Sequence, residues 1–186
     1  MTRRPPGYES ALISKIPEAA LKAIRGLKES RRWPLLLTGN VGAGKTCAAA
    51  CLYGAYSRMP MWHRADDLLL GMATGRTDGI FVDVKNELNE VERRKLAFNT
   101  FVSRVGSTTC LFLDDLGTRR PTESMLQAMF DIMEYRKGKA LVVTTNLSVQ
   151  GIAELFDDRI ADRFACGTII KFEGDSRRER TQVVRV

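Results

Sequence analysis

The chain has 186 residues, enough for one domain with a full hydrophobic core. Its hydrophobic content of 44% and charged content of 27% are ordinary for a soluble globular protein. No apolar run is long enough to span a membrane and the N-terminus lacks a signal-peptide core, so we expect a cytoplasmic protein. The net charge of +7 permits binding to nucleic acid but equally suits a solvated basic surface.

The cysteines and the histidine argue against a zinc site. No two of the four cysteines form a C-x-x-C pair, and His63 is the single histidine. A structural zinc site needs clustered ligands. We therefore expect reduced, mostly buried thiols and no zinc.

The chain divides into a short leading segment and a main domain. Residues 1–7 form a tail rich in proline and arginine, and from Tyr8 to Lys28 apolar residues recur at near-helical spacing. Pro17 either divides this segment into two helices or kinks it. We predict an N-terminal tail and helical segment over 1–32 and the main domain over 33–186.

Short apolar runs that read as buried strands alternate with helical stretches along the main domain. The predicted strands are 35–37, 61–64, 110–113, 140–143 and 168–172. The predicted helices are 45–57, a helix starting at 66, 83–105, 122–136, 149–156 and 157–164, with 71–79 as a glycine-rich loop. This alternation predicts an α/β fold with a parallel sheet covered on both faces.

The stretch from Gly39 to Thr46 fits G-x-x-x-x-G-K-[ST], the phosphate-binding P-loop, between a predicted strand and a predicted helix. The glycines let the backbone curl so that successive N–H groups hold phosphate oxygens, and the helix dipole favours an anion. Lys45 would reach the β- and γ-phosphates of ATP, and the Thr46 hydroxyl would ligate Mg²⁺. A plain glycine-rich turn would not explain the placement of these two side chains. The predicted nucleotide-binding residues here are Gly39, Asn40, Val41, Gly42, Ala43, Gly44, Lys45, Thr46 and Cys47.

Two carboxylates follow the predicted strand 110–113. Asp114 stands where a Walker B aspartate orients Mg²⁺ through water, and Asp115 stands where a base for the attacking water would be. The alternative is a pair of solvent-facing acids at a strand end. With a P-loop upstream, the pattern favours a Mg²⁺ site at Thr46 and Asp114 with Asp115 as a catalytic residue.

Three further motifs follow the P-loop in order: Leu-Asp-Asp-Leu-Gly at 113–117, Thr-Thr-Asn at 144–146 and Asp-Arg-Ile-Ala-Asp-Arg-Phe at 158–164. With them, the chain resembles the AAA+ ATPases of the DnaC/DnaI helicase-loader group and the related IstB transposition helpers. The resemblance implies a P-loop NTPase: a three-layer α/β/α sandwich with a five-stranded parallel sheet, binding ATP and Mg²⁺. Loaders of this group usually carry an extra N-terminal domain, whereas only a short helical segment precedes this P-loop. As in the loader group, there is no room after Phe172 for a full C-terminal lid.

The resemblance also implies roles for three residues. Asn146 matches the sensor 1 residue that positions the attacking water, although it is alternatively a helix cap. Arg163 matches the arginine finger, which completes the site of a neighbouring subunit; Arg159 is the second candidate, and both alternatively form surface salt bridges. Arg178, in a G-x-S-x-R segment, matches a sensor 2 arginine that touches phosphate within its own subunit, or it belongs to a solvated basic tail.

Contact with DNA is implied by the resemblance alone, as single-stranded DNA in the centre of a spiral or ring of subunits. The candidate cations are Arg93, Arg94, Lys95, Arg119 and Arg120. A solvated basic face explains each cluster equally well. Trp33 and Tyr8 either line the adenine pocket or pack in the core.

We therefore expect a DnaC-like helicase loader or loader-type accessory of DNA replication that binds and hydrolyses ATP. Its ATP state would control self-association through a shared site and its grip on single-stranded DNA or a partner helicase. An IstB-like transposition helper and an ATP-switched adaptor with little turnover are the alternatives. A small-molecule P-loop kinase is disfavoured, because it does not need the Thr-Thr-Asn and Asp-Arg-Phe motifs.

Overall fold

A computed structural model describes residues 4–30, 32–56, 60–74, 89–105, 108–173 and 176. Its centre is a five-stranded sheet in the order β2-β3-β4-β1-β5, in which every neighbouring pair is parallel. The strands are β1 (Leu35–Gly39), β2 (Met61–Arg64), β3 (Cys110–Leu116), β4 (Ala140–Thr145) and β5 (Thr168–Phe172). The predicted α/β fold with a five-stranded parallel sheet is confirmed.

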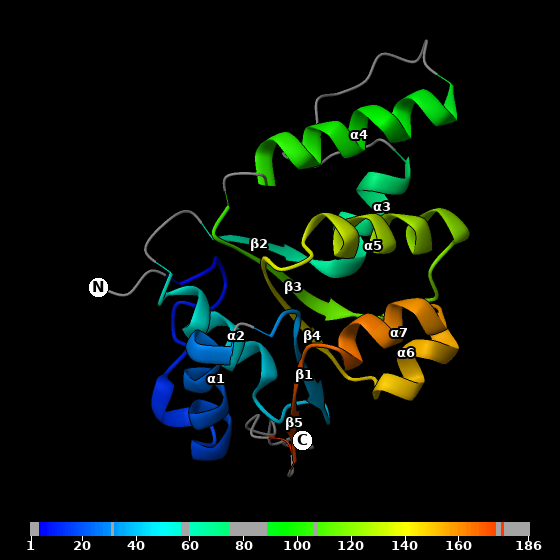
Figure 1. The fold of residues 1–186 in the computed structure, drawn as a ribbon. Helices are drawn as coiled ribbons and strands as arrows, with labels where there is room; N and C mark the ends of the chain where they lie inside the picture. Colours follow the sequence, from blue (N-terminus) through cyan, green and yellow to red (C-terminus); the bar gives the residue numbers. More distant parts are fainter. Residues whose placement is uncertain are drawn as a thin grey trace, which may run out of the picture.

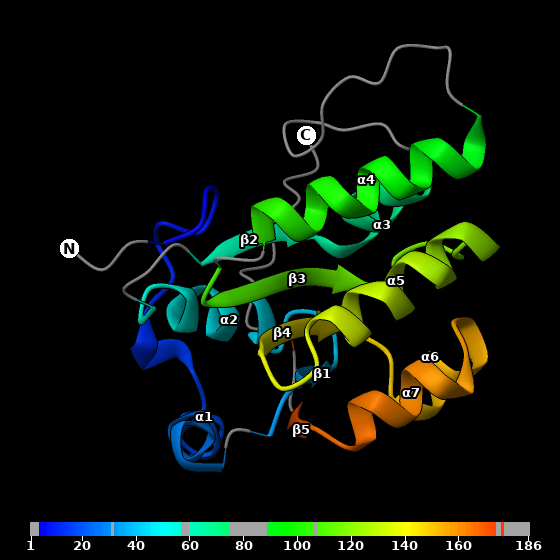
Figure 2. The ribbon, with the colours of Figure 1, turned by 45° about the horizontal axis from the view of Figure 1, so that its top comes forward.

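Helices cover both faces of this sheet (Figures 1 and 2). One face carries the short 3₁₀ turn η1 (Ile13–Lys15), α1 (Glu18–Ser30) and α2 (Lys45–Tyr53). The other face carries α3 (Ala65–Thr74), α4 (Glu90–Val105), α5 (Glu123–Tyr135), α6 (Val149–Leu155) and α7 (Asp158–Ala165). The result is the predicted three-layer sandwich.

Alternating side chains of the central strands build the two cores. On β1, Leu36 packs with the helices α3 to α7, while Leu35 and Leu37 pack under α1 and α2. On β3, Leu111 and Leu113 take the first face and Phe112 the second. Both faces are buried, which is why these strands read as continuous apolar runs in the sequence.

Among the described residues, four helices begin at capping side chains, and in one of them, α4, Asn89 accepts a hydrogen bond from the backbone of Glu92. Thr122 accepts a hydrogen bond from the backbone of Met125, and Ser148 accepts one from Gly151. Asp157 accepts one from the backbone of Arg159 at the start of α7. Each cap satisfies an N–H group that the first helical turn leaves unpaired.

Some predicted element boundaries were wrong. The prediction of a loop over 71–79 is wrong for its first residues, because α3 continues to Thr74. Met72 and Ala73 are buried, and the burial of this apolar face outweighs the low helix propensity of Gly71. The helix after the P-loop ends at Tyr53 rather than near residue 57. The N-terminal segment is divided, with η1 before Pro17 and α1 after it. Residues 75–79 of the predicted loop and residues 83–88 of the predicted long helix lie outside the described residues, and α4 begins at Glu90, one position after the described Asn89.

Candidate nucleotide site

The P-loop lies at the carboxyl edge of the parallel sheet, between the end of β1 and the start of α2. Gly39, Gly42 and Gly44 have positive φ values of 133°, 80° and 103°. A Cβ at Gly39 would lie 2.1 Å from the backbone oxygen of Phe172 on the neighbouring strand. The loop is thus curled as the motif predicts, and glycine is required where β1 and β5 meet.

Lys45 joins the P-loop to the end of β4. Its side chain is buried, and its ammonium donates to the backbone oxygens of Gly39 at 2.8 Å and Asn40 at 2.6 Å. It also donates to Oδ1 of the exposed Asn146 at 2.8 Å. An ammonium has three N–H donors, so these three acceptors satisfy it. Two predicted site residues that are 101 positions apart are therefore in direct contact.

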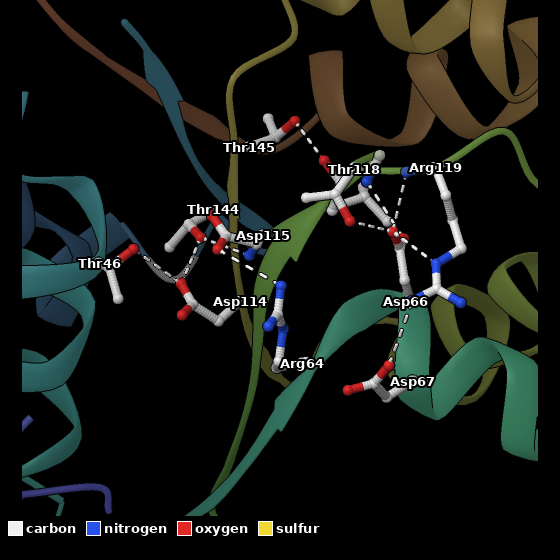
Figure 3. A network of polar contacts seen from close by, with 12 residues as sticks. Thr46, Arg64, Asp66, Asp67, Asp114, Asp115, Thr118, Arg119, Thr144 and Thr145 are labelled. Atoms are coloured by element: carbon white, nitrogen blue, oxygen red, sulfur yellow. Dashed lines mark hydrogen bonds and ion pairs between the residues drawn. The ribbon is translucent and has the colours of Figure 1, made fainter. Parts of the chain in front are cut away.

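Asp114 lies on β3 opposite the first turn of α2. Its Oδ1 accepts hydrogen bonds from the hydroxyls of Thr46 at 3.0 Å and Thr144 at 2.6 Å, as Figure 3 shows. Its Oδ2 accepts a hydrogen bond from the hydroxyl of Tyr8 at 3.0 Å. Burial raises the pKa of the Asp114 carboxyl above its usual value, while the hydrogen bond from Thr144 lowers it.

A β-bulge separates the roles of the two neighbouring aspartates. The register between β3 and β4 shifts between Leu113 and Leu116, and Asp115 has a φ of 57°, the only positive φ of a non-glycine residue within the described ranges. Its backbone N–H donates to the Thr144 hydroxyl at 2.9 Å, and its carboxylate lies 4.0 Å from the Arg64 guanidinium (Figure 3). A bulge redirects side chains along a strand. Asp114 is consequently buried, whereas the Asp115 side chain stays 38% exposed.

Solved structures of other proteins share the fold that carries this site. The chain aligns with the crystal structure of DnaI at 19% identity and TM-score 0.64, covering 94% of each chain. It aligns with the crystal structure of the DnaC helicase loader at 17% identity and TM-score 0.65, covering 91% of this chain and all of that one. It aligns with the replication initiator DnaA bound to AMPPCP and single-stranded DNA at 22% identity and TM-score 0.66. That match covers 92% of this chain but 51% of the DnaA chain, so the chain spans about half of that protein.

The chain has the AAA+ P-loop fold. No protein-family model matches the sequence, and no curated protein matches it. The similarity to DnaI and DnaC therefore establishes the fold, and it confirms at that level the resemblance that the motifs predict.

The oxygen donors at the P-loop suit Mg²⁺. The Thr46 hydroxyl and the Asp114 carboxylate converge in the P-loop, and Mg²⁺ usually takes one or two such protein groups plus phosphate oxygens and water. Among the described residues, no group of three or more histidine, cysteine, aspartate or glutamate side chains forms a metal cage. The four cysteines are free; Cys51 and Cys110 are buried, Cys47 is half-buried and Cys166 is exposed, so the prediction of mostly buried thiols is met by two of the four.

Sequence reasoning did not identify the part played by Asp66 beside this site. Asp66 is buried at the start of α3 and accepts hydrogen bonds from Thr118 Oγ1 at 2.5 Å and from the backbone of Arg119 at 3.1 Å. It also accepts from the backbone of Gly117 at 3.3 Å. Figure 3 shows these contacts converging on one carboxylate. Asp66 therefore fixes the loop that leaves β3 just after the two site aspartates.

Arg163 lies far from the P-loop of its own chain. Its guanidinium donates to Oε1 of Glu134 through Nε at 2.8 Å and through Nη2, and it lies 4.3 Å from the ring centroid of Phe130. It lines a cleft of about 360 Å³ together with Trp33 and Pro34, the residues just before β1. The P-loop follows the other end of β1, roughly 15 Å away for a strand of this length. Arg159 instead pairs with Asp157 at 2.9 Å.

The remaining predicted residues are dispersed. Arg178 and the side chains of Arg93 and Arg94 lie outside what the structure describes. Ser176, which belongs to the same predicted segment as Arg178, lies close to the P-loop, since a Cβ at Gly42 would be 2.1 Å from the Ser176 hydroxyl. Arg119 pairs with Asp66 and Asp67, while Lys95 and Arg120 are exposed. Tyr8 reaches Asp114, whereas half-buried Trp33 lies at the opposite edge of the sheet. Within the described ranges, no helix has the length and apolar character needed to cross a membrane.

Proposed function

We propose that this protein is a cytoplasmic AAA+ ATPase of DNA replication that acts as a DnaC-like helicase loader or loader-type accessory. The observation that carries the proposal is the convergence of Lys45, Thr46, Asp114 and Asn146 at one edge of the sheet. The fold shared with DnaI, DnaC and an AMPPCP-bound DnaA supports nucleotide as the ligand and replication as the setting.

The proposed chemistry assigns a task to each of these groups. The backbone of residues 39–44 and the Lys45 ammonium bind the phosphates of ATP, and Lys45 exchanges a carbonyl contact for a phosphate oxygen. Thr46 and Asp114 hold Mg²⁺, which neutralises charge on the phosphates when bound. The exposed Asp115 carboxylate accepts a proton from the attacking water, and Asn146 orients that water.

Arg163 completes the site of a neighbouring subunit in this proposal. It lies at the amino edge of the sheet, so its guanidinium is remote from its own P-loop. A second copy whose P-loop meets this edge would receive Arg163 beside the γ-phosphate, where an arginine stabilises the charge of the transition state. The glutamate and the aromatic ring that hold Arg163 keep its guanidinium at the protein surface.

The partners belong to the same proposal. The DnaA neighbour is bound to single-stranded DNA, and we infer that this chain also grips single-stranded DNA or a partner helicase in an ATP-dependent way. The described candidates for phosphate contacts are the exposed cations Lys95, Arg119 and Arg120, of which Arg119 also pairs with Asp66 and Asp67. An IstB-like helper shares the same ATPase core and differs only in its partner, so capture of the replicative helicase by the ATP-bound protein separates the two.

A complementation assay tests the shared site. We expect Arg163→Ala to bind ATP normally but to lower turnover by roughly a thousandfold, the usual effect of losing such an arginine. Asp115→Asn should also be inactive alone. Mixing the two variants should restore part of the wild-type rate, because some sites then combine an intact Asp115 with an intact Arg163 from the neighbour.

The controls and contrary outcomes are defined by the same assay. Arg25→Ala removes an exposed arginine of α1 and should leave turnover unchanged. If wild-type turnover per subunit is independent of protein concentration and the mixed variants stay inactive, the shared-site mechanism is wrong. An adaptor with little turnover would instead keep nucleotide-dependent partner binding in Asp115→Asn.

A further inference from the structure

The segment before the main domain reaches into the candidate metal site. Turns order this segment: the Tyr8 backbone donates to Pro5 at 3.1 Å, and the Ala11 backbone donates to Tyr8 at 3.0 Å. The thiol of Cys47 on α2 lies 3.8 Å from the backbone oxygen of Leu12. The segment is thereby held over the first turn of the P-loop helix, although it precedes that helix by a whole strand and another helix.

An aromatic stack directs Tyr8 toward the carboxylate. The Tyr8 ring lies 5.4 Å from that of Trp62, and Trp62 stacks on Phe112 with centroids 5.6 Å apart and planes 18° apart. Phe112 and Asp114 are two positions apart on β3, so their side chains emerge on the same face. Tyr8 is at the end of this stack, where its hydroxyl meets Asp114.

The hydrogen bonds on Asp114 leave a defined place for a metal-bound water. A carboxylate offers about four lone-pair sites, two on each oxygen. Thr46 and Thr144 donate to Oδ1, and Tyr8 donates to Oδ2. Thr46 could keep donating its hydrogen bond to Asp114 while a lone pair of its oxygen binds Mg²⁺. The remaining site on Oδ2, beside the Tyr8 hydroxyl, is the one that could accept a hydrogen bond from a water bound to the ion.

We propose that Tyr8 is a positioning residue of the Mg²⁺ site, which makes the N-terminal segment part of the nucleotide-binding machinery. This inference rests on the proposed ATP–Mg²⁺ function. The phenol fixes the orientation of Asp114, so that Oδ2 would accept a hydrogen bond from a water of the ion, and the phenol oxygen could accept a further hydrogen bond from that water shell. Outer-shell partners of this type typically contribute roughly 10- to 100-fold to metal affinity.

Magnesium titrations of nucleotide binding test this role. Binding of a fluorescent ATP analogue is measured against Mg²⁺ concentration for the full-length wild type and for Tyr8→Phe, which keeps the ring and removes only the hydroxyl. We expect Tyr8→Phe to raise the half-saturating Mg²⁺ concentration about tenfold while metal-free nucleotide affinity is unchanged. Tyr53→Phe removes a hydroxyl from another ring that contacts Trp62, so it is the matched control and should leave the titration unchanged.

The outcomes separate this inference from the proposed function. If the wild type binds no nucleotide with or without Mg²⁺, the ATPase proposal itself fails. If the wild type binds and Tyr8→Phe has the same or a lower half-saturating Mg²⁺ concentration, only the role of Tyr8 is refuted. Trp62 fluorescence in a Trp33→Phe background checks packing, since Trp33 and Trp62 are the two tryptophans. Unchanged emission in Tyr8→Phe establishes that the ring still contacts Trp62.

Discussion

His63 makes the stability of this protein sensitive to mild acid. It lies on β2 next to Leu113 of β3, and its Nε2 atom is buried without a hydrogen-bond partner among the described residues. Burial lowers the pKa of His63 from 6.5 to about 4, because the charged imidazolium would lose its hydration. The unfolded chain therefore takes up a proton near pH 6.5, whereas the folded chain does so only near pH 4.

The difference between the pKa values of His63 in the unfolded and folded chain determines how stability changes with pH. The contribution of His63 to stability is fully present above pH 6.5 and is lost as the pH falls toward 4. Each tenfold difference in proton affinity corresponds to about 1.4 kcal/mol, so the full loss is about 3 kcal/mol and the loss at pH 5 is about 2 kcal/mol. That is a substantial fraction of the roughly 5–15 kcal/mol that stabilises a typical domain.

Urea denaturation of the wild type and of His63→Gln between pH 7.5 and pH 4.5 measures this contribution. Glutamine does not titrate, and carboxylates titrate alike in both proteins, so the difference between the two curves isolates His63. The wild type should lose about 2 kcal/mol more than the variant by pH 5. Because the chain has one histidine, an NMR titration reads its pKa directly. Parallel loss of stability in the two proteins, or a measured pKa near 6.5, would refute the reasoning.

Three further predictions concern the supports of the site. Asp66→Ala should lower the free energy of unfolding by about 3 kcal/mol, because three hydrogen-bond donors of the loop lose a buried acceptor. Asp67→Ala is the control: the Asp67 side chain is 62% exposed, so its loss should change the free energy of unfolding by less than about 0.5 kcal/mol. Equal effects of the two substitutions in chemical denaturation would contradict the supporting role of Asp66. Gly39→Ala should strongly destabilise the folded protein, because the new Cβ would lie 2.1 Å from the backbone oxygen of Phe172. Gly26→Ala on α1 should instead raise the melting temperature, because a Cβ there would meet nothing within 4 Å and alanine favours a helix more than glycine does. Glu134→Gln should change ATP turnover by less than about fivefold, because an exposed ion pair such as that between Glu134 and Arg163 contributes little free energy. A loss of turnover as large as that of Arg163→Ala would show that Glu134 is essential for the action of Arg163.

The strands and the P-loop were predictable because their signals are local. A run such as Leu35 to Leu37 reads as a buried strand whatever surrounds it, and the glycines and Lys45 of the P-loop form a compact pattern. The order of later motifs was enough to predict the AAA+ fold. Parallel strands then bring Asp114 and Asn146 to one edge without further information.

The supporting contacts were not predictable, since they join distant positions. Asp66 and Thr118 are 52 positions apart, and Tyr8 and Asp114 are 106 apart. In the sequence, Asp66 and Asp67 are typical of the negative charges that stabilise the start of a helix. This pattern does not predict which loop the carboxylates bind. The bulge that separates Asp114 from Asp115 depends on pairing with β4, which one strand's sequence does not encode.

The two proposals about catalysis depend on protein concentration in different ways. Tyr8 and Asp114 belong to one chain, so the half-saturating Mg²⁺ concentration for nucleotide binding should stay constant on dilution. Arg163 lies at the other edge of the sheet from the P-loop, so turnover should fall as subunits separate. Diluting the wild type while following both quantities therefore distinguishes them. If the Mg²⁺ requirement rises together with the loss of turnover, the metal site itself is completed by the neighbour, and the assignment of Tyr8 as its support within one chain is wrong.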